Sequence, residues 1–156
     1  MGMVLLARTL AALGGDGARV ALVANDTPAL NDVTLPELEG LVSACAGADP
    51  VLAALLKAGR VVCLPSGQSS TLLDMSRCGE RLNAWVSAEL GEVPPSEWVV
   101  VLDGMGRSLE SNWGAWQYVL PGVDVLTLAM IKSEINALRL DAEVYDCVVR
   151  LGAEMA

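Results

Sequence analysis

Apolar runs alternate with stretches of helical periodicity along this chain. Five short runs rich in valine and leucine are continuously apolar, which is typical of parallel strands buried on both faces. They span residues 19–24, 60–64, 98–102, 124–130 and 144–149. Helical patterns lie near residues 1–13, 35–46, 50–58, 78–90 and 133–140. This alternation predicts an α/β fold, a three-layer αβα sandwich around a mostly parallel, Rossmann-like sheet.

Local sequence signals support these helix boundaries. Thr34 is followed three residues later by Glu37, which is the pattern of a capping box. Asp49 precedes Pro50, so it predicts an N-cap followed by a proline in the first helical position. Gly59 then predicts the end of that helix.

Length and charge limit the classes of function. A chain of 156 residues, 53% of them hydrophobic, predicts one folded domain over residues 1–156. The net charge of −9 gives a surface that repels phosphodiester backbones and anionic lipids. We therefore expect neither a nucleic-acid partner nor a membrane partner.

The chain contains no histidine, which excludes Ser-His-Asp and Cys-His nucleophilic sites and imidazole metal ligands. Any metal would be held by oxygen, which favours hard divalent cations. The four cysteines are scattered without a C-x-x-C pair, so zinc binding is unsupported. Reduced thiols predict a cytoplasmic protein.

Polar residues follow four of the predicted strands. Because ligands of open parallel sheets bind beyond the carboxyl ends of the strands, we expect these segments to converge on one rim. Lys132 directly follows an apolar run, where an amine costs desolvation energy unless a group such as phosphate accompanies it. In chain order the segments are Asn25, Asp26, Asn31 and Asp32; SGQSST (66–71); DGMGR (103–107); and Lys132.

Each of these segments also has a plainer interpretation. Asp26 and Asp32 are common turn and cap residues, and SGQSST reads as an ordinary loop. DGMGR resembles a dinucleotide fingerprint, but Leu109 stands where the third glycine belongs. Its glycines also suit a tight turn or a backbone nest for an anion. The four tryptophans favour packing over base stacking; they are Trp85, Trp98, Trp113 and Trp116.

Four consecutive motifs resemble those of the metal-dependent damage-control phosphatases. They are PALNDVT (28–34), SGQSSTLLDMSR (66–77), DGMGRSLESNW (103–113) and MIKSEINALRL (130–140). The similarity covers about residues 1–150 and is greatest to the plant-type proteins and to the phosphatase domain fused to pantothenate kinases. This resemblance implies hydrolysis of a small phosphate ester such as 4′-phosphopantetheine or its damaged forms, within coenzyme A metabolism.

The resemblance also implies roles for individual residues. Asp32 would bind a divalent metal such as Mg, Mn, Co or Ni, and Lys132 and Asp103 would act in catalysis. Asp103 stands where the family more often has glutamate, and Ser111 replaces the threonine that precedes Asn112. The substrate-binding positions would be Asn31, Ser69, Gly104, Gly106, Arg107 and Asn112.

The family pattern places an Asp-Asn metal-ligand pair and a helical region before the first helix. We therefore expect this chain to be the C-terminal portion of such a domain, with impaired metal binding and an uncovered apolar edge that favours homo-oligomers. Three hypotheses follow: a phosphatase, a non-catalytic interaction or regulatory module, and a nucleotide-binding domain. Metal-dependent phosphate release separates the first two, and nucleotide binding would support the third.

Overall fold

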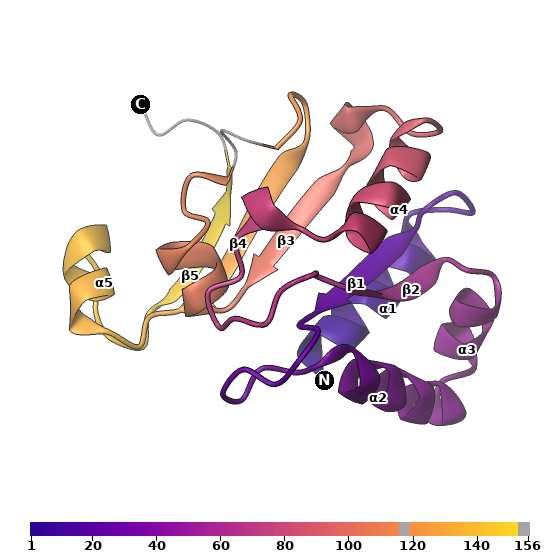
Figure 1. The fold of residues 1–156 in the computed structure, drawn as a ribbon, viewed down its shortest axis with the longest axis horizontal. Coiled ribbons are helices and arrows are strands. Elements are labelled where there is room, and N and C mark those ends of the chain that lie inside the picture. The colour runs from indigo at the N-terminus through magenta and orange to yellow at the C-terminus, as the bar shows by residue number, and fades with distance from the viewer. Residues whose placement is uncertain (116–118, 153–156) are drawn as a thin grey trace. The chain divides into compact units, whose positions relative to one another are not determined.

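The computed structural model describes residues 1–115 and 119–152, which divide into two compact units. The first unit comprises Met1–Ser69 and Gly79–Leu82, and the second comprises Ser70–Cys78 and the chain from Asn83 onward. Figure 1 labels the main elements in chain order. These are α1 (Gly2–Leu13), β1 (Val20–Ala24), α2 (Leu35–Ala48), α3 (Pro50–Lys57), β2 (Val61–Pro65), α4 (Glu80–Leu90), β3 (Val99–Asp103), β4 (Asp124–Met130), α5 (Glu134–Leu140) and β5 (Cys147–Leu151).

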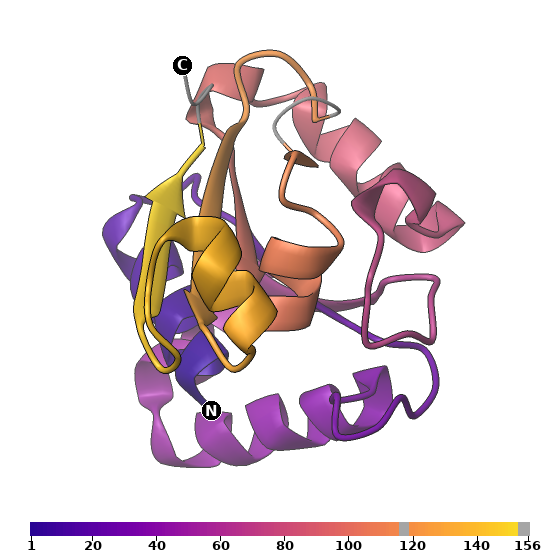
Figure 2. The same cartoon turned by 90° about the vertical axis from the view of Figure 1, so that its left-hand side faces the viewer.

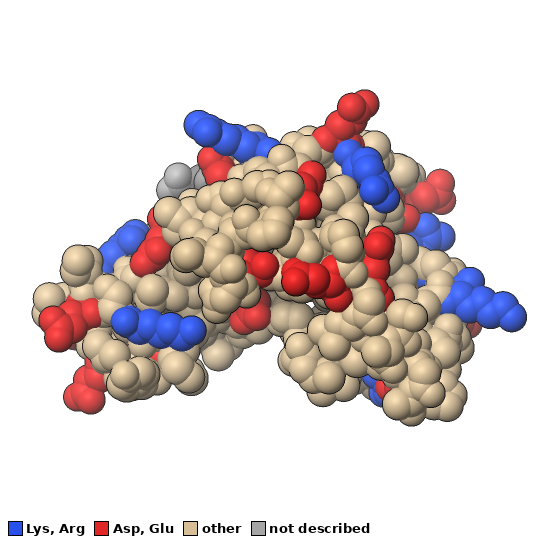
Figure 3. All heavy atoms as spheres, turned by 60° about the horizontal axis from the view of Figure 1, so that its bottom comes forward, with Lys and Arg blue, Asp and Glu red and all other residues tan. Residues whose placement is uncertain are grey.

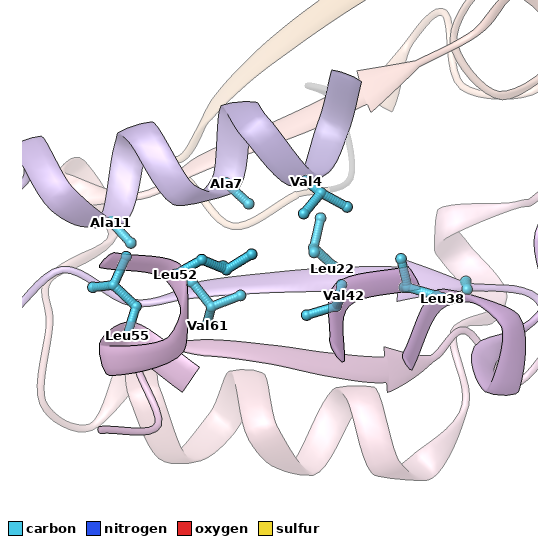
Figure 4. Packing of buried hydrophobic residues seen from close by; sticks show 10 residues of the cluster. Val4, Ala7, Ala11, Leu22, Leu38, Val42, Leu52, Leu55 and Val61 are labelled. Atoms are coloured by element: carbon cyan, nitrogen blue, oxygen red, sulfur yellow. The ribbon is translucent and has the colours of Figure 1, made fainter. Parts of the chain in front are cut away.

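The first unit is built on the parallel pair β1–β2. Leu22 pairs with Cys63 and Val20 with Val61, so these side chains share one face of the pair. That face packs in one core with buried residues of α1, α2 and α3, among them Val4, Val42 and Leu52 (Figure 4). Truncating Leu52, which is 2% exposed, to alanine would cost about 2–5 kcal/mol of stability.

Capping interactions fix the helices of this unit. The Asp49 carboxylate accepts hydrogen bonds from the backbone N–H groups of Val51 and Leu52, as the sequence predicts. It also pairs with Arg8 of α1 at 2.9 Å. The Arg60 guanidinium donates to the carbonyl oxygens of Ala11 and Gly15 near the end of α1. The unit is therefore held by polar contacts at helix ends as well as by its core.

The second unit contains a three-stranded sheet in the order β3–β4–β5. Val100 and Val125 are paired neighbours in the parallel ladder between β3 and β4, and both belong to the core on one face. Near the end of β4, Leu109, Ile131 and Ala137 form a second core cluster. Both ribbon views accordingly place α5 beside the segment that follows β3 (Figures 1 and 2).

The α/β fold with parallel strands is confirmed, but β5 differs from expectation. It begins at Cys147 rather than at residue 144, and it runs antiparallel to β4. Tyr145 has φ +79°, and Asp146 N–H bonds to the Glu143 carbonyl, so residues 143–146 form a turn. Within the described residues, hydrogen bonding yields a two-stranded and a three-stranded sheet rather than one sheet of five strands.

The described tryptophans pack against other side chains, as predicted. Trp85 and Trp98 meet edge to face with ring centroids 6.0 Å apart. Arg150 and Arg139 lie 4.3 and 5.5 Å from the ring centre of Trp113. Trp116 lies outside the described residues.

None of the helices in the described ranges is both long and apolar enough to cross a membrane.

Candidate functional site in two strand-end segments

The loop that follows β1, residues 25–34, is closed at its base by main-chain hydrogen bonds. We refer to it as the acidic loop. Asn25 and Thr34 form a parallel bridge, and Leu35 N–H donates to the Asn25 carbonyl at 2.9 Å. Thr34 also donates to Glu37 from its N–H (2.9 Å) and its hydroxyl (2.7 Å). These bonds lower the pKa of Glu37, and the predicted capping box between Thr34 and Glu37 is confirmed.

A tight turn within the acidic loop places the predicted metal ligand. Asp32 N–H donates to the Ala29 carbonyl at 3.0 Å, and Leu30 takes a left-handed conformation with φ +50°. As a result Asn31 is exposed while Asp32 is half-buried. The oxygens Asn25 Oδ1 and Asp32 Oδ2 are both buried and accept no hydrogen bond within the described chain, although both residues make other interactions.

These oxygens test whether the loop suits the divalent metal that the sequence predicts. A carboxylate and an amide oxygen are ligands of the type that hard divalent cations prefer. However, among the described residues no three aspartate, glutamate or cysteine side chains are grouped so that they could hold a metal ion. The acidic loop therefore offers the right kind of ligand but does not form a complete metal site.

The other acidic residue of the acidic loop, Asp26, forms hydrogen bonds to the segment that follows β2. Its carboxylate accepts a hydrogen bond from Gly67 N–H at 2.8 Å, and its own N–H donates to the Gln68 carbonyl at 2.9 Å. Gly67 has φ +78°, a conformation that glycine adopts without steric cost. Ser66 is fully buried, whereas Ser69 is exposed. The structure thus brings Asp26 and the start of SGQSST together.

In the second unit, a glycine turn directly follows β3. We call residues 103–107 the glycine loop. Gly104 has φ +98°, and its N–H donates to the Leu128 carbonyl of β4 at 2.9 Å. The Gly104 carbonyl accepts from both the N–H and the hydroxyl of Ser108. Asp103, immediately before this turn, has an exposed side chain.

The last two residues of the glycine loop begin a π-helix, Gly106–Glu110, which was not predicted from the sequence. Single π-helical turns often occur at functional sites. A dinucleotide fingerprint instead requires its glycines to open a full helix whose N-terminus faces the pyrophosphate. A five-residue π-helix does not provide that arrangement, so the structure does not support the nucleotide-binding hypothesis.

Lys132 lies beside the glycine loop. Its backbone N–H contacts the Met105 sulfur at 3.3 Å, and the preceding residue, Ile131, is fully buried. The ends of β3 and β4 therefore bring Asp103, Arg107 and Lys132 into one region of the second unit. The Lys132 side chain itself is exposed. The expectation that its amine is desolvated and needs a partner such as phosphate was therefore wrong.

Asn112, predicted to contact substrate, is instead 1% exposed and bonded to the main chain. Its Oδ1 accepts from Met75 N–H at 3.0 Å, and its Nδ2 donates to the carbonyls of Leu73 and Arg107 at 2.5 and 2.6 Å. The network was not predictable from the sequence, because two of its three backbone partners, at Met75 and Leu73, lie 37 and 39 residues away. The cluster of short polar residues at 108, 111 and 112 is the one local signal for it.

The half-buried cysteines Cys63 and Cys78 are poor candidates for a nucleophile. All four cysteines are free thiols. Burial, with a smaller contribution from Glu39, raises the pKa of Cys63, and burial together with Asp74 raises that of Cys78. A raised pKa favours the protonated thiol at neutral pH, whereas the thiolate is the nucleophilic form.

The fold and these strand-end loops define an α/β protein with a candidate anion site at a glycine turn. The chain belongs to the family described as the damage-control phosphatase ARMT1-like domain, whose model matches residues 2–148. Among curated relatives, pantothenate kinase 2 of Oryza sativa subsp. japonica is 34% identical over 96% of this chain. A damage-control phosphatase of Arabidopsis thaliana is 31% identical over 86% of it.

A more distant relative is the 4′-phosphopantetheine phosphatase of Mus musculus, 24% identical over 86% of this chain. The crystal structure of a DUF89 family protein from Pyrococcus horikoshii covers 86% of the chain with a TM-score of 0.52 at 17% identity, which shows a shared fold. The chain spans 17% of the rice kinase, 33% of the Arabidopsis phosphatase, 21% of the mouse phosphatase and 37% of the archaeal chain.

Proposed function

We propose that this chain acts in the hydrolysis of a small phosphate monoester, with 4′-phosphopantetheine or its damaged forms as the substrate. Family membership supports phosphatase chemistry, and the name of the mouse relative supports this substrate class. The observation that carries the proposal is the glycine loop, where a backbone turn, an arginine and an exposed lysine occur at one end of two parallel strands.

The proposed roles follow from the charge of each group. Lys132 and Arg107 bind the phosphate oxygens as their negative charge increases in the transition state. The open space beside Gly104, which carries no side chain, allows close approach of the ester. Gly106 is a proposed substrate contact through its backbone alone, because the Thr71 carbonyl oxygen fills the space that a side chain would take. Asp103 orients the attacking water and accepts its proton as the P–O ester bond breaks, and the leaving oxygen takes a proton from solvent water to give the free alcohol. Asn31 and Ser69, both exposed, are proposed substrate contacts.

Asp32 is the proposed contribution of the acidic loop to a divalent metal, such as Mg, Mn, Co or Ni. When bound, such a cation neutralises phosphate oxygens and activates water. Because the described residues offer an incomplete ligand set, hydrolysis by this chain should be weak.

The charge distribution favours a small substrate over a polymer. The chain carries a net charge of −9, and on the face shown in Figure 3 basic side chains lie in separate groups among acidic and neutral ones. Polyanions such as nucleic acids require an extended basic surface, whereas one phosphate needs two or three cationic or N–H groups. We propose a cytoplasmic protein without nucleic-acid or membrane partners.

The second candidate is a non-catalytic interaction or regulatory module. It is favoured by the missing group of three metal-binding side chains among the described residues. Under this alternative the glycine loop still binds phosphate, but the ester is not cleaved.

Phosphate release separates the two candidates. The chain should release phosphate from p-nitrophenyl phosphate and from 4′-phosphopantetheine when Mg, Mn, Co or Ni is added. Lys132→Met should lower kcat by about 100-fold or more, because one charge that stabilises the transition state is lost. Lys57→Met, which removes an exposed lysine from α3, is the matched control and should retain the parent rate.

A rate no higher than the metal-free blank, with every metal, would favour the non-catalytic module. An equal loss of kcat in Lys57→Met and Lys132→Met would show that the lower rate comes from the reduced positive charge of the chain as a whole. It would argue against a specific role of Lys132 at the reacting phosphate.

A further inference from the structure

The segment Ser70–Cys78 is held against the π-helix by a buried polar network inside the second unit. Asn112 is its centre, because it bonds to Met75, Leu73 and Arg107 at once. The Ser111 hydroxyl lies within hydrogen-bond distance of the carbonyl oxygens of Leu73 (3.0 Å) and Gly106 (2.9 Å), and its single hydrogen donates to one or is shared between them. One amide side chain therefore connects two segments that are far apart in sequence.

The two segments also touch where a side chain would not fit. A Cβ atom built on Gly106 would lie 2.9 Å from the Thr71 carbonyl oxygen, which is too close for a real contact. Gly106 thus lets the backbone of residues 70–78 approach the turn that carries Arg107. The hydrogen bonds of Asn112 fix this approach in one arrangement.

We propose that Asn112 is a positioning residue for phosphate binding: it locks the segment 70–78 onto the π-helix and so fixes the backbone at Arg107. This inference rests on the proposed function of the glycine loop. Both hydrogens of the Asn112 amide have close carbonyl acceptors and its oxygen has an N–H donor, so its bonding serves the protein rather than a ligand. Its effect on phosphate is therefore indirect, through Arg107.

The network is sensitive to isosteric change. Asn112→Asp keeps an oxygen facing Met75 N–H but replaces the amide donor with a carboxylate oxygen that faces two carbonyl groups. Buried polar groups left without partners destabilise their surroundings, so the segment should open locally. Ser111→Ala removes one hydroxyl and retains the asparagine, and it serves as a milder variant if Asn112→Asp does not fold.

Three measurements on the whole chain test the proposal. Amide hydrogen exchange at Met75 should be about 10- to 100-fold faster in Asn112→Asp, because the segment that carries it opens more often. The affinity for inorganic phosphate, followed by calorimetry, should fall by about 10-fold, and KM for p-nitrophenyl phosphate should rise more than kcat falls. Ser111→Ala should show these changes in the same direction and to a smaller extent.

The matched control is Asn136→Ala. Asn136 is also buried and also bonds near the π-helix, but its Nδ2 donates to Glu110 at 3.0 Å and not to residues 73–75. This variant should leave both Met75 exchange and phosphate affinity unchanged.

The outcomes separate this proposal from the proposed function. Faster exchange at Met75 with unchanged phosphate affinity would show a merely structural asparagine and overturn the inference. Unchanged exchange at Met75 with weaker phosphate binding would indicate that Asn112 contacts the substrate directly, and it would also overturn the inference. If the parent chain binds phosphate but does not hydrolyse an ester, the proposed phosphatase activity is wrong and the positioning role of Asn112 stands. If the parent chain does not bind phosphate, both proposals are overturned.

Discussion

Gly104 shows how one residue sets the geometry of the candidate anion site. Its φ of +98° lies in a region that side-chain-bearing residues rarely adopt, yet a Cβ atom there would meet nothing within 4 Å. The cost of any side chain at this position is therefore a backbone cost rather than a steric clash with neighbours. The turn depends on glycine for its conformation.

We predict that Gly104→Ala destabilises the second unit by about 1–2 kcal/mol, the usual cost of a left-handed L-residue. Urea unfolding followed by tryptophan fluorescence measures this, because Trp85, Trp98 and Trp113 lie in the second unit. Gly40→Ala is the control: Gly40 lies inside α2 with open space around it, so alanine should stabilise that helix by about 0.5–1 kcal/mol. Because α2 belongs to the first unit, circular dichroism measures the unfolding of this variant. If Gly104→Ala leaves the free energy of unfolding unchanged, the turn accommodates a residue with a side chain and does not depend on glycine.

At the scale of elements, local signals predicted more than long-range pairing. The cap at Asp49 and the helix end at Gly59 were predictable because the interacting groups lie within a few residues. The antiparallel direction of β5 was not predictable, since an apolar run of five residues carries no information about its partner. The same holds for Asn112, since two of its three partners, Met75 and Leu73, belong to a distant segment.

The helix caps predict how stability of the first unit depends on pH. Hydrogen bonding to Leu52 and Arg8 lowers the pKa of Asp49 from 3.8, and bonding to Thr34 lowers that of Glu37 from 4.5. A carboxyl group whose folded-state pKa is lowered stabilises the fold fully above its ordinary pKa. That contribution is lost as the pH falls through the folded-state value.

We therefore expect the melting temperature of α-helical structure, measured by circular dichroism, to fall as the pH drops below about 4. Asp49→Asn should reduce this dependence, because asparagine can still accept hydrogen bonds at the cap but does not titrate in this range. Asp16→Asn, at an exposed position that caps no helix, is the control. If Asp49→Asn shows the same pH dependence of melting temperature as the parent chain, that dependence comes from carboxylates other than Asp49.

At the scale of the whole molecule, one face of the β3–β4–β5 sheet bears exposed apolar side chains. In the register of the sheet Met130 pairs with Cys147, Leu128 with Val149 and Leu126 with Leu151. Val149 and Leu151 are 73% and 62% exposed. Contiguous exposed apolar surface of this kind favours association, and β5 is also an edge strand.

We propose that the chain forms homo-oligomers through this face, and we predict that the apparent mass in light scattering rises with protein concentration. Added salt should strengthen association, because it screens the repulsion between chains that each carry a net charge of −9. Val149→Lys should reduce the association, since it places a charge in the centre of the exposed row. Leu13→Lys, at an 81% exposed site in α1, should have little effect. A chain that stays monomeric at all salt concentrations would exclude this face as the contact. An equal loss of association in Val149→Lys and Leu13→Lys would exclude it as well, because only a specific apolar interface responds to the position of the added charge.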